Sequence, residues 1–123
     1  MNDAQTTIAE LRELVRQFVD ERQWRKFHAP KNLSMALAIE AAELMEHFQW
    51  LDVDASRELP ADPAKLAAAA EELADVIAYG LALANELELD LSTAIRAKMI
   101  KNAQKYPAER FQGVYEKPQP QDQ

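Results

Sequence analysis

Cysteine is absent from the 123-residue chain, and glycine occurs only twice. Without thiols the chain has no disulfide, no thiolate metal site and no cysteine nucleophile. The alternation of β-branched residues that is typical of strands is also missing, while alanine and leucine are abundant. These absences favour an all-α fold, and the length suits one domain with a core of its own.

Long apolar runs and an excess of positive charge are missing as well. The longest apolar stretch, residues 76–84, is far shorter than the roughly 20 residues of a membrane-spanning helix, and MNDAQTTIAELREL contains no signal-peptide core. The formal net charge of -7 argues against a nucleic-acid binder, which needs a basic face for phosphates. We therefore expect a cytoplasmic protein that binds neither membranes nor nucleic acid.

Helical periodicity predicts four helices, at residues 8–27, 33–50, 63–87 and 91–105. Thr7 and Glu10 match a capping box at the first start, and Asn32 is the expected cap of the second helix. Asp62 followed by Pro63 predicts the third start. A polar connection is expected at 51–61. The predicted domain covers residues 1–107, and residues 108–123 are expected to form a flexible tail.

The helix predicted at 63–87 is apolar over a wide arc. Leu66, Leu73 and Ile77 form one stripe, and Val76 and Leu87 extend it sideways. A helix with so wide an apolar surface is usually enclosed on more than one side. In a chain of this length the pattern favours a homo-oligomer, and a thick monomer core is the alternative.

Two pairs of acids with three-residue spacing carry the strongest chemical signal. Glu40 and Glu43 lie on one face of the helix at 33–50, and Glu72 and Asp75 repeat the spacing on the next helix. Glu40 also falls within an apolar stripe, where an unpartnered carboxylate is costly. If the helices pack, the four carboxylates converge and repel one another. A divalent cation such as Mg²⁺ would remove the repulsion, although surface acids often show this spacing by chance.

Aromatic residues accompany the acids. Trp24 and Trp50 each lie beside a predicted helix end, and Tyr79 lies one turn after Asp75. Flat side chains next to a site for metal and phosphate suit a nucleobase, because aromatic rings stack on it. Packing in the core is the alternative interpretation.

Basic and amide side chains share one face of the helix at 91–105. Lys98, Asn102 and Lys105 are spaced for that face, where they can hold phosphate oxygens. Lys31, before the helix at 33–50, is a further candidate. A solvated basic face would give the same pattern, so the lysines alone do not discriminate.

Four sequence blocks in order resemble the all-α nucleoside triphosphate pyrophosphohydrolases of the MazG-like superfamily, and most of all their dCTP pyrophosphatase branch. The blocks are WxxFHxPKNL at 24–33, ExxELxExFQW at 40–50, EELADVIAY at 71–79 and KMIKNAQKYP at 98–107. The resemblance covers most of the chain. It implies a four-helix bundle that assembles as a dimer or a dimer of dimers, with sites near subunit interfaces.

The resemblance also implies cleavage of a nucleoside triphosphate between its α- and β-phosphates, with Mg²⁺ as the cofactor and Mn²⁺ as a substitute ion. The products are a monophosphate and pyrophosphate. The implied metal ligands are Glu40, Glu43, Glu72 and Asp75. The implied substrate contacts are Trp24, Trp50 and Tyr79 at the base and sugar, Lys98, Asn102 and Lys105 near the phosphates, and His28 and Lys31 from the first block.

One position departs from that branch, because animal dCTP enzymes carry a histidine where this chain has Val15. The apolar side chain removes one polar contact from the expected pocket. Deoxycytidine triphosphate and its 5-modified forms are the first expected substrates, and a broader set of pyrimidine or damaged nucleotides is the alternative.

Glu40 and Glu43 are the expected catalytic residues. Glu43 is the candidate general base, since it lies at the edge of the apolar stripe and reaches water more easily than Glu40. Two other functions stay open: a helical oligomerisation or regulatory module without catalysis, and a nucleotide sensor without turnover. The first of them explains the wide apolar helix but leaves Glu40 without a role.

Overall fold

The computed structural model describes residues 1–114, and every regular element within that range is helical. The all-α prediction is therefore confirmed for the described part of the chain. None of its helices combines the length and the apolar character that a membrane span requires. The chain divides into two compact units, residues 1–88 and the segment that begins at Leu89.

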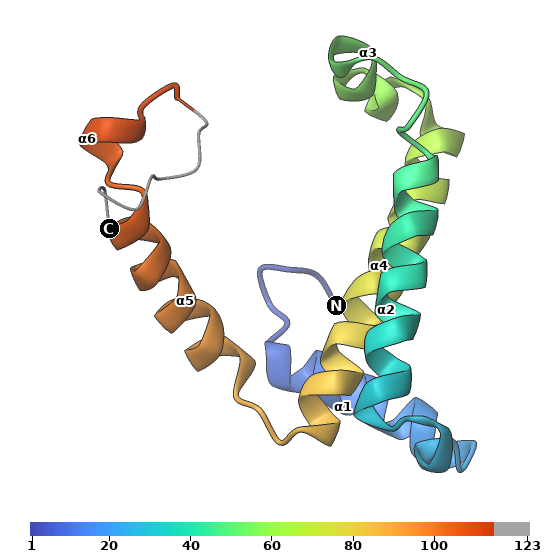
Figure 1. The fold of residues 1–123 in the computed structure, drawn as a ribbon. Helices are drawn as coiled ribbons and strands as arrows, with labels where there is room; N and C mark the ends of the chain where they lie inside the picture. The colour runs from blue at the N-terminus through green and yellow to red at the C-terminus, as the bar shows by residue number, and fades with distance from the viewer. Residues whose placement is uncertain (115–123) are drawn as a thin grey trace. The chain divides into compact units, whose positions relative to one another are not determined.

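The elements of the first unit are α1 (Ile8–Glu21), the 3-10 turn η1 (Arg25–Phe27), α2 (Pro30–Glu46), α3 (Val53–Arg57), the 3-10 turn η2 (Leu59–Ala61) and α4 (Pro63–Glu86). Helices α2 and α4 lie side by side along most of their length, and α1 lies against the C-terminal half of α4 (Figure 1). The second unit contains α5 (Leu91–Lys105) and α6 (Ala108–Phe111).

Capping side chains start three of the helices where the sequence predicts. The Oγ1 atom of Thr7 accepts the backbone N–H of Glu10 at 3.1 Å, and a carboxylate oxygen of Glu10 accepts the N–H of Thr7 at 2.7 Å. Asp62 accepts two N–H groups from the first turn of α4, at 3.0 and 3.2 Å. Asp90 caps α5 through one N–H at 2.8 Å. These bonds satisfy donors that a helix start otherwise leaves unpaired.

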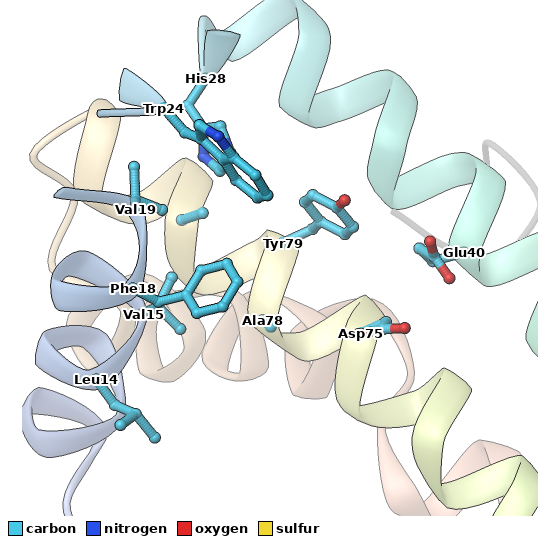
Figure 2. Close-up of a pocket in the computed structure, with 11 residues that line it drawn as sticks. Leu14, Val15, Phe18, Val19, Trp24, His28, Glu40, Asp75, Ala78 and Tyr79 are labelled. Atoms are coloured by element: carbon cyan, nitrogen blue, oxygen red, sulfur yellow. The ribbon is translucent and has the colours of Figure 1, made fainter. Parts of the chain in front are cut away.

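The predicted first helix, 8–27, is too long. Helix α1 ends at Glu21, because Gln23 adopts a φ of 53°, a left-handed conformation that an α-helix cannot contain. The chain then forms η1 and enters α2. The break turns the Trp24 side chain out of the helical row of α1 and toward α4, where Tyr79 lies (Figure 2).

The predicted second helix, 33–50, is displaced along the chain. Helix α2 begins at Pro30, whose fixed φ suits the first helical turn. Asn32 is inside the helix, and its side-chain amide donates to the backbone oxygen of Phe27 at 3.2 Å instead of capping. The helix ends at Glu46, so Trp50 lies in the turn that follows.

Two segments predicted to be irregular contain short helices. The connection at 51–61 forms α3 and η2, because Asp52 caps α3 through an N–H at 2.7 Å and Leu59 is buried. Helix α6 forms within the predicted tail, 108–123. Residues 115–123 lie outside the described part, so the division into a domain and a tail stays a prediction.

Arg12 and Asn85 fasten α1 to α4 by reciprocal hydrogen bonds. The Nε atom of Arg12 donates to Oδ1 of Asn85 at 2.9 Å, and Nδ2 of Asn85 donates to the backbone oxygen of Arg12 at 3.1 Å. Arg12 also donates to the backbone oxygen of Ala84 at 3.3 Å. Because these groups are partly buried, breaking one bond leaves its partner poorly solvated. We call this pair of residues the Arg12–Asn85 clamp.

The buried apolar side chains of the described residues form a small core. They are Val19, Leu33, Leu59, Ala69, Leu81, Ala82 and Ala84. Larger apolar side chains on α2 and α4 stay exposed, among them Ile39 at 59%, Leu73 at 50% and Ile77 at 52%. An apolar surface of this extent is typical of a face that another protein surface covers.

Gly80→Ala is expected to raise the free energy of unfolding by about 0.5–1 kcal/mol, because glycine weakens a helix interior. A Cβ atom at Gly80 meets Leu37 Cδ1 at 3.9 Å, an ordinary contact. Denaturant titration of the full chain measures the gain. Gly113→Ala is the control: its φ of 68° strains any side chain, so it should bring no gain. A less stable Gly80→Ala variant would contradict the prediction.

Candidate functional site

Three carboxylates from two helices meet in the first unit. Glu40 and Glu43 project from α2 and Glu72 projects from α4, and one oxygen of each lies within 4.8 Å of the others. The three-residue spacing puts the first two on one face of α2, and the packing of α2 on α4 brings the third opposite them. We call these three residues the acid cluster. Its oxygens could hold a metal ion.

Glu40 is the member of the cluster that has a buried carboxylate oxygen without a partner. Its side chain is half-buried, and its Oε2 atom is buried with no hydrogen-bond partner. The pKa of Glu40 is raised to about 7, first by desolvation and then by the neighbouring Glu43, by Glu72 and by the charge of Asp75. A buried oxygen with no partner and a carboxyl surrounded by acids fit a site for a hard cation, which favours the charged carboxylate.

Asp75, the fourth predicted metal ligand, follows Glu72 by one turn of α4 and is exposed. It is not one of the three clustered acids, but it lines the same cavity as Glu40. Figure 2 shows the two carboxylates at one end of that cavity. The structure therefore gathers three of the predicted acids closely and places the fourth beside them.

The cavity has a volume of about 430 Å³, which is in the range of small-molecule sites. Its lining residues are Leu14, Val15, Phe18, Val19, Trp24, His28, Glu40, Asp75, Ala78, Tyr79 and Ala82. In Figure 2 the side chains of α1 lie at the end away from the carboxylates, and Tyr79 lies between the two ends. One end is therefore acidic, and the other is apolar and aromatic.

Aromatic rings form part of the apolar end. The rings of Phe18 and Trp24 pack edge to face with centroids 5.7 Å apart, and the guanidinium of Arg22 lies 3.7 Å from the centre of the Phe18 ring. Trp24, His28 and Tyr79 also line a second cavity of about 460 Å³. Rings that border open space in this way can stack on a planar ligand.

Trp50 and Lys31 are not brought to these cavities. Trp50 is 88% exposed in the turn after α2, and Lys31 is exposed in the first turn of α2. Lys98, Asn102 and Lys105 lie on α5 in the second unit. Their predicted contacts with phosphate stay a prediction.

Sequence reasoning missed part of the apolar end of the cavity. The sequence does not single out Leu14, Phe18, Val19, Ala78 or Ala82 as candidates for a binding site. A signal for the alanines exists in the spacing, since positions 75, 78, 79 and 82 fall on one face of α4. Val15, the position that departs from the dCTP pyrophosphatase pattern, does line the cavity.

Comparison with known proteins agrees with this geometry. A sequence model of the MazG-like family matches residues 35–119, which is more than half of the chain and includes the acids of α2 and α4. The chain belongs to the MazG-like family.

Curated relatives of this MazG-like chain include two proteins named dCTP pyrophosphatase 1. The one from Rattus norvegicus is 40% identical over 107 residues, covering 87% of this chain and 63% of the relative. The one from Homo sapiens is 41% identical over 102 residues, covering 83% of this chain and 60% of the relative. The chain thus spans less than two thirds of the length of these relatives.

A solved structure of a pyrophosphatase from Archaeoglobus fulgidus is also similar. The TM-score is 0.75 and the sequence identity is 38%, over 87% of this chain and 98% of that chain. The similarity therefore extends over almost the whole of the archaeal chain.

Glu40→Gln is expected to stabilise the metal-free protein at pH 8. Because folding raises the pKa of Glu40 from 4.5 to about 7, the folded state holds the extra proton between those values, and the wild-type protein loses stability as pH rises through that window. Glu40→Gln has no ionisable group at position 40, so its stability does not fall with pH for this reason. Thermal melts with chelator at pH 5 and pH 8 measure the difference, which should be larger at pH 8.

Glu46→Gln, at an exposed glutamate of α2, is the control for the removal of one negative charge. Equal gains in the two variants at pH 8 would show that the environment of Glu40 is not the cause. Added Mg²⁺ at pH 8 should stabilise the wild type more than Glu40→Gln.

Proposed function

We propose that this MazG-like chain is a nucleoside triphosphate pyrophosphohydrolase, which cleaves between the α- and β-phosphates and releases a monophosphate and pyrophosphate. The observation that carries the proposal is that one cavity has both an acidic end and an aromatic, apolar end. A nucleoside triphosphate has two matching parts, a flat base and a phosphate chain that binds divalent cations. The names of the relatives and of the archaeal structure support the same chemistry.

The proposed substrate is dCTP or a 5-modified dCTP. Support comes from the relatives named dCTP pyrophosphatase 1, at about two fifths identity. Val15 gives the cavity wall a hydrocarbon surface where the animal enzymes are expected to have a polar group. A broader set of pyrimidine triphosphates is therefore the alternative substrate class.

Glu40, Glu43, Glu72 and Asp75 are the proposed ligands of Mg²⁺, with Mn²⁺ as a substitute. The bound ion would neutralise phosphate charge and lower the pKa of a coordinated water. Glu40 contributes the buried oxygen that has no other partner, and the exposed Glu43 has the readier access to solvent.

Glu43 is also the proposed general base. It would accept the proton of the water whose oxygen attacks the α-phosphorus, while the bond from that phosphorus to the bridging oxygen breaks and pyrophosphate leaves. Trp24 and Tyr79 would stack on the base, and His28 would contact the nucleoside. Lys31, Lys98, Asn102 and Lys105 are the proposed phosphate contacts.

A homodimer or homotetramer built from four-helix bundles is the proposed assembly. The exposed side chains of Ile39, Leu73 and Ile77 supply an apolar surface for a second copy of the chain. Trp50, also exposed, would reach a nucleotide only within such an assembly.

A non-catalytic helical module is the second candidate function. The exposed apolar faces favour it as much as they favour the enzyme. It gives no reason for three carboxylates within 4.8 Å of one another, because such acids repel and lower the stability of the fold.

Glu40→Ala is expected to lower Mg²⁺-dependent pyrophosphate release by about 100-fold or more, since it removes a metal ligand. The measurement is pyrophosphate release from a panel of nucleoside and deoxynucleoside triphosphates, with Mg²⁺ and with chelator. Glu71→Ala, at an exposed glutamate of α4, is the control and should retain activity. A folded wild type that cleaves no triphosphate would support the non-catalytic module.

Glu43→Gln is expected to lower turnover by roughly 10²- to 10⁴-fold, the usual effect of losing a general base. Stabilisation by Mg²⁺ in thermal melts should be largely kept, since the amide oxygen still offers a ligand atom. Near-normal turnover with retained Mg²⁺ binding would remove Glu43 from the role of base. A loss of both would assign it to metal binding alone.

A further inference from the structure

The apolar end of the cavity has one bulky wall and one small wall. Helix α1 contributes Val15 and Phe18, whereas α4 contributes Ala78 and Ala82. The alanines continue the face of α4 that begins with Asp75 at the acidic end. Ala78 is half-buried and Ala82 is 5% exposed, and Figure 2 shows Ala78 on α4 together with Asp75 and Tyr79.

The width of this end is fixed by the attachment of α1 to α4. The Arg12–Asn85 clamp joins the two helices with bonds of 2.9 and 3.1 Å, and Val19 is buried. The helices therefore cannot move apart without breaking partly buried hydrogen bonds. Space for a ligand exists because the side chains at positions 78 and 82 are methyl groups, and a longer side chain at either position would fill it.

The two helical walls of this end offer no hydrogen-bonding side chain to a ligand. The surfaces that α1 and α4 present between Val15, Phe18, Ala78 and Ala82 are hydrocarbon. A site of this kind selects a ligand by shape and by stacking, and each added or missing carbon group changes its discrimination by about 10- to 200-fold. These two walls therefore discriminate between bases by size, in addition to any hydrogen bonds that His28, Trp24 or Tyr79 offers.

We propose that Ala78 and Ala82 are specificity-determining residues, whose methyl groups let the cavity accept bases larger than an unsubstituted pyrimidine. This inference rests on the proposed function, because it names the size class of the base at the same site. The predicted consequence is that a bulky apolar substituent on the base is tolerated by the wild-type chain and rejected when position 78 is enlarged.

The experiment compares dCTP with 5-propynyl-dCTP, which differ only in an apolar group on the base. For Ala78→Leu the ratio of kcat/KM, bulky over plain substrate, should fall by about tenfold or more relative to wild type, mainly through KM. Ala70→Leu, at an exposed position of α4, should leave the ratio unchanged. Val15→Ala added to Ala78→Leu should restore much of the ratio by reopening the cavity from α1.

Calorimetric binding of dCMP and 5-propynyl-dCMP to the same proteins separates this inference from the proposed function. If the wild type cleaves neither triphosphate, but Ala78→Leu lowers the affinity for 5-propynyl-dCMP relative to dCMP, the proposed function is overturned and the size selection is supported. An unchanged ratio in Ala78→Leu, by turnover or by binding, overturns the inference. A wild type that binds neither monophosphate and cleaves neither triphosphate overturns both. Ala78→Val, a smaller enlargement, replaces Ala78→Leu if that variant does not fold.

Discussion

Repulsion among the carboxylates between α2 and α4 is the constraint on which the rest of the structure depends. The longest packed pair of helices in the first unit is also the pair that brings Glu40, Glu43 and Glu72 within 4.8 Å of one another. Helix packing therefore works against the charges that it gathers. The metal-free chain lowers this strain by holding a proton on Glu40 near neutral pH, and a cation would remove it by charge compensation.

The same helices leave much of their apolar surface uncovered. The buried apolar residues of the described part are few, and several of them are alanines, while large side chains such as Ile39 and Ile77 face outward. A chain that buries so little apolar area by itself gains little of the hydrophobic stabilisation that folding requires. The second copy of the chain that we propose would supply the missing contact.

Local signals in the sequence predicted the parts of the fold that depend on local chemistry. Thr7, Asp62 and Asp90 start helices because their side chains bond to amides a few residues away, so the pattern contains the whole interaction. The spacing of the acids placed each pair on one face of its helix, but the meeting of Glu40, Glu43 and Glu72 depends on the packing of α2 on α4. The end of α1 was missed, because the left-handed residue there is Gln23, with no glycine or proline to mark the break.

The apolar end of the cavity could not be predicted from local patterns. Which face of α1 meets α4 depends on Arg12 and Asn85, which are 73 positions apart in the chain. Periodicity shows that Phe18 and Val19 are apolar, but it does not show that a space lies beside them. Trp50 was predicted to line the site because it follows the acids of α2 in sequence. In the structure its side chain is exposed and does not line the cavity.

Helix α1 contributes none of the carboxylates of the acid cluster, yet it supplies one wall of the cavity. The clamp that holds it lies near the C-terminal end of α4, well along the helix from Glu72. Mutations in α1 can therefore accumulate without disturbing the acids, and mutations in the acids are not needed to reshape the wall. The wall on α1 and the acid cluster can therefore change independently during evolution. Related proteins with this fold can differ in the ligand that they prefer while they keep the same acids.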